Sequence, residues 1–343
     1  MKTNRIKKTY YEEHAEKYSD LIEEINKKYG DNTDISFDSH KAHSEDDDLW
    51  NRIGKKLVEN NANYGKVLAC GDQNNISEAI SQIVSSMFMS YGVKKSGKMI
   101  YHMEENLLCM LSEMRVLTNF KGLVFPHNSF FIDFPSGIIS TTDHSGFTDR
   151  RQTVIGAFVS NGICTCCNEK KLRITLVSRL GDKKEKSIAF FTSRIDLKDY
   201  KSESGLISSL CKHNDIPGIE QEIDLLKIVI NSITYIISKN ADLEMVPKDI
   251  TKKIDNPKKK KRNNVCRLAY TIVGKNISGL RRGGFDTDGM TPKWKLNRKI
   301  VVSGHSKRQH YGPGNSLVKI ISLLPYEKGP KDTPLESRDY LVK

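Results

Sequence analysis

The feature that most constrains the fold is an apolar helical segment, GIEQEIDLLKIVINSITYIISKNADLE, at residues 218–244. Isoleucine and leucine recur there at the three- and four-residue spacing of one helix face. A helix with an apolar surface this wide is largely buried, so we expect it to pack against a sheet. The face consists of Ile219, Ile223, Leu226, Ile230, Ile233 and Ile237, widened by Leu225, Val229 and Ile236.

The sheet is predicted immediately before this helix, in residues 122–196. Aromatic and β-branched segments alternate there with short turns containing Gly, Pro, Asn and Lys. Links of hairpin length join strands without intervening helices, which indicates antiparallel pairing. The candidate strands are LVFPHNSFFIDFPSG, TVIGAFVSNGICTCC, KLRITLVSRLG and KSIAFFTSRI.

The remaining segments extend this prediction to a whole-chain α+β fold. We expect an N-terminal helical region, a mostly antiparallel sheet packed by a long helix, and a C-terminal β-hairpin module after a basic linker. Residues 101–118 are expected to be helical, because Met103, Leu107, Met110, Leu111 and Met114 recur at helical spacing. The predicted boundaries are 1–121 for the helical region, 122–246 for sheet and helix, 247–292 for the linker and 293–343 for the hairpin module and tail.

Net charge is the strongest compositional signal, at +13 for the whole chain. Such a field attracts polyanions, most often nucleic acid, and the attraction weakens with salt. Residues 252–264 carry seven Lys and Arg against one Asp, so nothing there can pack into a core. This run is predicted to be a phosphate-contacting arm or a solubilising tether, and its basic residues are Lys258, Lys259, Lys260, Lys261 and Arg262, with Arg281 and Arg282 further on.

The C-terminal hairpin carries the densest group of polar side chains, in GHSKRQHYGPGNS at residues 304–316. Period-two alternation along a regular strand puts His305, Lys307 and Gln309 on one face. It puts Arg308 and His310 on the other face, unless the strand bulges.

Three interpretations of this hairpin remain open. It is a polar tip without chemistry, a nucleic-acid contact, or a metal-independent ribonuclease site with His305 as base, Lys307 or Arg308 on the phosphate and Gln309 in a positioning role. Aromatic residues among cations favour contact, because their rings stack on unpaired bases. The candidate contact residues are Trp294, Arg298, Lys307, Arg308, His310 and Tyr311, together with the basic linker residues.

The same hairpin resembles a family of uncharacterised bacterial and phage proteins. The matching positions are His305, Gln309, Tyr311, Gly312, Pro325 and Gly329. The segments FFIDFP at residues 130–135 and NSITYIISKNAD at residues 231–242 also resemble this group, so about a quarter of the chain is covered. The resemblance implies a prokaryotic or viral source, which argues against a nuclear signal in the basic run, and carries no activity.

The seven cysteines are odd in number and irregular in spacing, which indicates a reducing compartment rather than a disulfide framework. Cys164 and Cys167 form a C-x-x-C pair, and with Cys211 and His213 they are a weak candidate for a structural zinc site. Small buried residues at a sheet edge are the alternative, and no other cofactor is expected.

No membrane segment or secretory signal is expected, since the apolar stretch near 225–237 is interrupted and shorter than about 20 residues. A cytoplasmic location follows as an expectation. The leading functional hypothesis is a phage-type protein that binds RNA or single strands through the linker and hairpin. The alternatives are a toxin-type ribonuclease and an inhibitor or interaction protein that meets an acidic partner.

Overall fold

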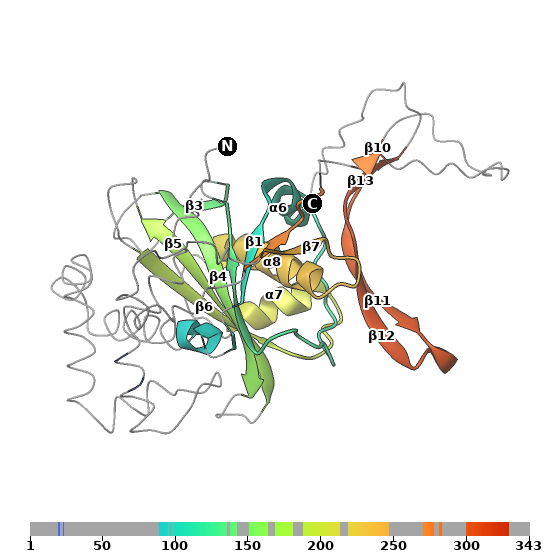
Figure 1. The fold of residues 1–343 in the computed structure, drawn as a ribbon, viewed down its shortest axis with the longest axis horizontal. Helices are drawn as coiled ribbons and strands as arrows, with labels where there is room; N and C mark the ends of the chain where they lie inside the picture. The colour runs from blue at the N-terminus through green and yellow to red at the C-terminus, as the bar shows by residue number, and fades with distance from the viewer. Residues whose placement is uncertain are drawn as a thin grey trace, which may run out of the picture.

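The described residues form an α+β fold built on one large sheet, which confirms the predicted fold class (Figure 1). The sheet has the strand order β6-β5-β4-β2-β1-β8-β7, with β3 paired to β4. The computed structural model describes residues 89–94, 96–97, 99–135, 138–142, 151–163, 169–180, 188–212, 219–246, 270–277, 281–282 and 300–328, and the single residues 20 and 23.

The sheet also includes strands that precede and follow residues 122–196, the segment in which the sequence predicts it. The antiparallel strands predicted from the sequence are present, but β1 and β8 lie outside residues 122–246. The bounds are β1 Ile100–Met103, β2 Ser129–Asp133, β3 Ser140–Thr142, β4 Arg151–Ile163, β5 Lys170–Leu180, β6 Ile188–Asp196, β7 Leu243–Val246 and β8 Tyr270–Val273.

The centre of the sheet is parallel, which the sequence did not indicate. Strand β1 pairs in parallel with both β2 and β8, whereas every other described pair in this sheet is antiparallel. Strand β8 also lies within the segment predicted to be linker, residues 247–292. Part of that segment is therefore built into the fold.

The helical prediction for residues 101–118 is correct only in its middle. Residues 101–103 belong to β1, and the helix α6 spans Glu105–Ser112. From Glu113 to Phe120 the described chain is irregular apart from isolated bridges. The apolar residues of β1 continue directly into the helical spacing of α6, so their combined pattern is the one expected of a single long helix.

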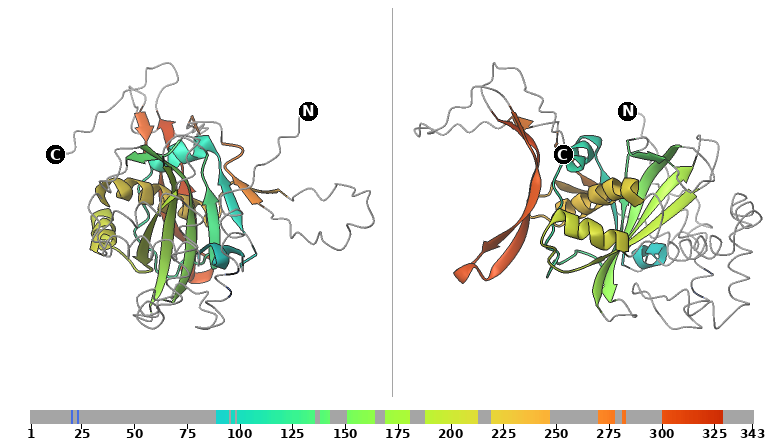
Figure 2. Two further views of the ribbon diagram at one scale, coloured as in Figure 1. Left: turned by 90° about the vertical axis from the view of Figure 1, so that its left-hand side faces the viewer. Right: turned by 180° about the vertical axis from the view of Figure 1, so that it is seen from behind.

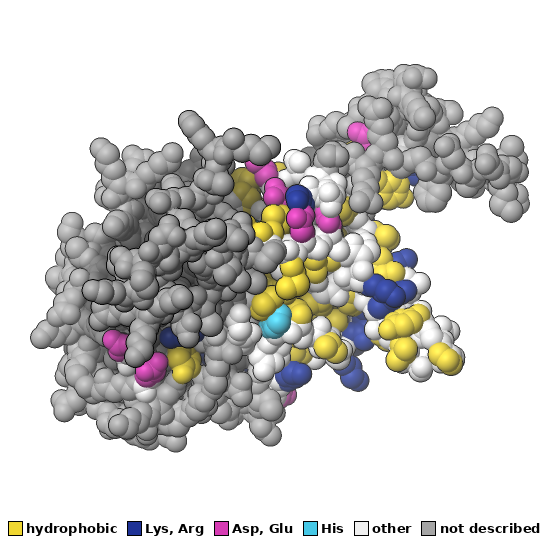
Figure 3. Space-filling model, viewed as in Figure 1, with side chains coloured by type: hydrophobic (Ala, Val, Ile, Leu, Met, Phe, Trp, Pro, Cys, Tyr) yellow, Lys and Arg dark blue, Asp and Glu magenta, His cyan; other side chains and the backbone are white. Residues whose placement is uncertain are grey.

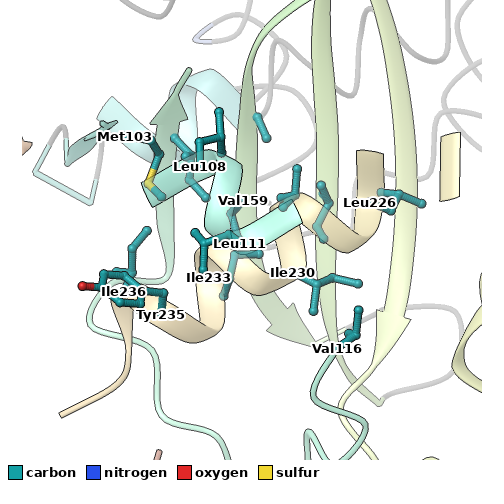
Figure 4. Close-up of a cluster of buried hydrophobic side chains, with 14 of the residues drawn as sticks. Met103, Leu108, Leu111, Val116, Val159, Leu226, Ile230, Ile233, Tyr235 and Ile236 are labelled. Atoms are coloured by element: carbon teal, nitrogen blue, oxygen red, sulfur yellow. The ribbon is translucent and has the colours of Figure 1, made fainter. Parts of the chain in front are cut away.

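The long helix is present as predicted: α8 spans Ile219–Ile236 and lies on one face of the sheet beside α7, Glu203–Lys212 (Figure 2). Its side chains Leu226, Ile230 and Ile233 are at most 1% exposed. They pack with residues of α6 and with Val159 from the sheet (Figure 4). Each such side chain contributes about 1.5–3 kcal/mol by leaving water, so this interface stabilises the fold substantially.

A buried amide joins α8 to α6. The Nδ2 of Asn231 donates to the carbonyl of Leu111 at 2.9 Å and to that of Met114 at 3.0 Å. Both carbonyls lie at or beyond the end of α6, where intrahelical partners run out. That of Leu111 also accepts from the N–H of Met114 at 3.3 Å. Asn231 thereby fixes the direction in which the chain leaves α6.

The C-terminal part adds two small sheets beside the main body (Figure 2). One is the hairpin of β11, His305–Tyr311, and β12, Leu317–Leu323, which matches the predicted hairpin. The other has the order β10-β13-β9, formed by Ile300–Val302, Tyr326–Lys328 and Arg281–Arg282. Strands β10 and β11 are separated at Ser303 and Gly304.

Within the described residues, no helix combines the length and apolar character needed to cross a membrane.

Replacing Asn231 with Ala should destabilise the protein by about 2–3 kcal/mol, because two buried hydrogen bonds, to the carbonyls of Leu111 and Met114, are lost. The matched control is Asn106→Ala. It removes one partly buried hydrogen bond, from the Asn106 amide to the carbonyl of Ile277 at 3.3 Å, and should cost about 1 kcal/mol. Urea unfolding of the two variants and the wild type measures both values. Equal losses would show that Asn231 does not organise the end of α6.

Asp196 at the end of β6 generates a pH prediction. Burial raises the pKa of its carboxyl, but hydrogen bonds from Lys198 and Lys171 lower it, and the net pKa lies below the usual value. A lowered folded-state pKa stabilises the protein above the ordinary pKa, and this stability is lost as pH falls through the folded-state value.

The difference in unfolding free energy between wild type and Asp196→Asn should therefore be largest near pH 7 and shrink below about pH 4. Asp224→Asn is the control, because the Asp224 side chain is 80% exposed and lies 3.5 Å from Lys227. Its effect should be small at every pH. A constant Asp196 difference down to pH 3 would contradict the assignment.

Candidate functional site

The β11–β12 hairpin is the candidate functional site, and its register fixes which side chains share a face. Cross-strand pairs run without a bulge from His305 opposite Leu323 to Tyr311 opposite Leu317. The pairs alternate between an inner face toward the body and an outer face. The outer face contains His305, Lys307, Gln309, Tyr311, Leu317, Lys319, Ile321 and Leu323, and the inner face contains Ser306, Arg308, His310, Val318, Ile320 and Ser322.

The inner face anchors the base of the hairpin. The hydroxyls of Ser306 and Ser322 are buried and 2.9 Å apart, and Ile320 is 6% exposed. The guanidinium of Arg308 donates to Asn119 Oδ1 at 3.2 Å and to the carbonyl of Lys121. Arg308 is therefore committed to holding the hairpin on the body.

The turn after α8 holds the edge of β12. The N–H of Lys239 donates to the carbonyl of Ile320 at 2.9 Å. The Asn240 amide donates to the carbonyl of Ser322 at 2.7 Å and accepts from its N–H at 3.0 Å. The Asn240 side chain thus bonds to the edge of β12 as the backbone of a neighbouring strand would.

The edge of β11 is held at Gly304. Its carbonyl accepts from the N–H of Arg115 at 3.1 Å, and Ser303 Oγ donates to the carbonyl of Glu113 at 3.2 Å. A Cβ on Gly304 would lie 2.6 Å from Met114 Cγ and from Pro325 Cδ. Only glycine permits this close approach of the two segments.

The far half of the hairpin projects from the body (Figure 1). Its turn uses Gly312 at φ 79°, Gly314 at φ 58° and Asn315 at φ 56°, and His310 Nδ1 donates to the carbonyl of Asn315 at 3.2 Å. These left-handed positions suit Gly and Asn. Large apolar side chains are exposed here: Tyr311 at 38%, Leu317 at 49% and Val318 at 38%.

Cations without carboxylate partners surround these apolar groups (Figure 3). Lys239, Lys307, Arg308 and Lys319 form no ion pair in the part of the chain that the structure describes. The ammonium groups of Lys319 and Lys239 lie 5.0 and 5.9 Å from the centre of the Tyr311 ring. The hairpin is thus a basic, partly apolar surface, which we call the hairpin surface.

The predicted site residues on this hairpin divide between the two faces as alternation requires. His305, Lys307 and Gln309 share the outer face, while Arg308 and His310 lie on the inner face. Because β11 has no bulge, His310 does not join His305. The outer face of this hairpin carries a single imidazole, and the catalytic and contact roles of these residues remain predictions.

The other predicted residues are mostly outside the described part of the chain. This applies to Lys258–Arg262, Trp294 and Arg298, and of Arg281 and Arg282 only the backbone, in β9, is described. It also applies to Cys164, Cys167, His213 and the Cys211 side chain, so the zinc site stays a prediction. Among the described residues, no group of three or more His, Cys, Asp or Glu could hold a metal.

Two features were missed from the sequence. Lys239 and Lys319 belong to the hairpin surface, and the absence of Asp and Glu between Ile300 and Tyr326 would have indicated Lys319. His102 of β1 and Asp133 of β2 form a cross-strand bond of 2.6 Å, and the His102 ring meets Tyr270 edge-on. The pair joins two parallel strands, which local sequence patterns do not place together.

The fold is an α+β body with a projecting basic hairpin, and comparison with known families gives its class. Residues 101–326 match the AcrVA2-like family, the anti-CRISPR type V subtype A2 family. This match extends from β1 to β13 and covers the sheet, α8 and the hairpin surface. The chain belongs to this family. The predicted phage-type source agrees with it.

A solved structure described as the crystal structure of AcrVA2 is similar to this chain at 12% sequence identity. The alignment covers 94% of this chain and 99% of the other, with a TM-score of 0.44. No curated protein matches the chain.

Gly304→Ala should weaken the attachment of the hairpin. The added methyl would collide with Met114, Pro325 and the Leu323 carbonyl, and such overpacking costs about 1–3 kcal/mol. Urea unfolding should show this loss, and trypsin should cleave at Lys307 and Lys319 faster than in the wild type.

Gly205→Ala in α7 is the control, since its Cβ would meet only Ser202 Oγ at 3.4 Å. Helix propensity predicts unchanged or slightly higher stability for it, by up to about 1 kcal/mol. If Gly304→Ala behaved like Gly205→Ala, the close approach at Gly304 would not hold the hairpin.

Proposed function

We propose that this protein inhibits a type V CRISPR system by binding one of its protein components through the hairpin surface. Membership of the anti-CRISPR family carries the proposal, because the family match includes both the body and the hairpin. The inhibitor hypothesis from the sequence is therefore favoured over the nucleic-acid hypothesis. Such a protein would act in the cytoplasm of the host bacterium.

The hairpin surface has the properties of a protein contact. Its cations have no carboxylate partners among the described residues, and Tyr311, Leu317 and Val318 expose apolar area next to them. Aromatic residues are enriched in protein interfaces, and complementary charge accelerates association. Anchoring through Gly304, Arg308 and Asn240 fixes the hairpin before binding, which reduces the entropy lost on association.

Nucleic-acid contact is the second candidate, because the same unpaired cations attract phosphate. Tyr311 offers one partly exposed ring for stacking on a base. The basic run at residues 258–262 would extend this surface. Binding that disappears at moderate salt and is displaced by RNA would support this candidate.

The ribonuclease alternative is less favoured by the geometry. Cleavage of RNA needs a base, a phosphate-binding cation and an acid on the same side of the site. The outer face supplies His305 and Lys307, but the other hairpin imidazole, His310, is on the opposite face. A catalytic role for His305 would require an acid from elsewhere.

The proposal is tested in a bacterium whose type V CRISPR system targets a reporter plasmid. The wild-type chain should restore transformation, and the Lys307→Glu, Lys319→Glu double variant should lose this activity because two attractive contacts become repulsive. The expected weakening of binding is about ten- to a hundredfold. Transformation efficiency is the measurement.

Lys201→Glu is the matched control, since Lys201 is an exposed lysine on the body before α7 and should behave like wild type. Full inhibition by the double variant would exclude the hairpin surface. Loss of inhibition in His305→Asn by a hundredfold or more, with binding retained, would instead support the ribonuclease alternative.

A further inference from the structure

The hydrogen bonds at the hairpin base show which backbone groups point away from the hairpin. Gly304, just before β11, and both Ile320 and Ser322 on β12 bond to groups outside the hairpin. Outward-pointing residues alternate along an antiparallel strand. The register pairs Ser322 with Ser306, Ile320 with Arg308 and Val318 with His310, so all even-numbered residues of the hairpin point outward.

The far part of β11 therefore has an unoccupied edge. Within the described residues, the outward N–H and C=O groups of Arg308 and His310 bond to no backbone or side-chain group. On β12 the turn after α8 occupies the edge at Ile320 and Ser322, which leaves only Val318 open. An open edge with several adjacent groups is a template for an added strand.

The charge beside this edge selects the kind of strand that fits. Lys307 and Lys319 are on the outer face, Arg308 and His310 on the inner face, and no Asp or Glu occurs between Ile300 and Tyr326. A second copy of this hairpin would bring like charges together, because neighbouring strands place side chains about 5 Å apart. An acidic segment meets the opposite charge at the same distance.

We propose that the far edge of β11 binds an extended, acidic segment of a partner polypeptide as an additional strand. The backbone groups of Arg308 and His310 pair with the segment, and its outer-face carboxylates lie beside Lys307. Alternate side chains of a strand share a face, so acids two residues apart fit best. This inference rests on the proposed function, since it specifies the segment by which the protein target is recognised.

The test uses the full-length chain and a fluorescein-labelled ten-residue peptide of alternating Glu and Thr, with binding followed by fluorescence anisotropy. This peptide should bind at least tenfold tighter than one of alternating Lys and Thr. Methylation of every second amide nitrogen on one edge of the Glu–Thr peptide should weaken binding at least tenfold. That comparison uses only the wild-type protein and does not depend on the folding of a variant.

A protein variant tests the same edge from the other side. His310→Pro removes an outward N–H, and proline is tolerated at such edge positions. His310→Ala is the reference because it loses the same imidazole and keeps the N–H. The proline variant should bind the Glu–Thr peptide at least tenfold more weakly than the alanine variant, with thermal unfolding as the check on folding.

Three results would overturn the inference. The first is no preference for the acidic peptide, and the second is no effect of peptide methylation. The third is tighter binding of a ten-nucleotide single-stranded RNA than of the Glu–Thr peptide, with RNA affinity unchanged in His310→Pro. Inhibition of the CRISPR system by His310→Pro at the level of His310→Ala would reject this edge and leave the proposed function intact. Peptide binding without any inhibition by the wild type would reject the proposed function and leave the edge site intact.

Discussion

The buried amide of Asn231 links the core helix α8 to the segment that contacts the base of the hairpin. It holds the carbonyls of Leu111 and Met114, and so fixes where the chain goes after α6. Two residues on this outgoing segment meet the hairpin: Met114 packs against Gly304, and Arg115 donates to its carbonyl. The core helix α8 therefore helps to position the hairpin through the Asn231 side chain, because losing a buried hydrogen bond is costly.

This arrangement gives the hairpin two different halves. The base is fixed by α8, by its following turn at Asn240 and by the segment after α6. The projecting half has exposed apolar side chains, unpaired cations and an open backbone edge, features that stable proteins usually limit. Their combination on an anchored base is what the proposed inhibitor function requires of a contact surface.

Local patterns predicted a large part of the fold. The helix α8, the antiparallel strands β4 to β6 and the hairpin follow from periodicity within each segment. The parallel pairing of β1 with β2 and β8 was missed, because strand order depends on contacts between distant segments. For the same reason the face shared by His305, Lys307 and Gln309 was predictable, whereas the approach of Lys239 to Tyr311 was not.

Hydrogen–deuterium exchange of the full-length chain, alone and with the purified type V effector, tests directly whether the hairpin contacts the effector. Exchange of the outward amides in residues 305–323 should be slower when the effector is present, above all at Arg308 and His310, which are open in the free protein. Protection confined to other parts of the chain, with unchanged exchange in the hairpin, would show that the hairpin is not the contact surface.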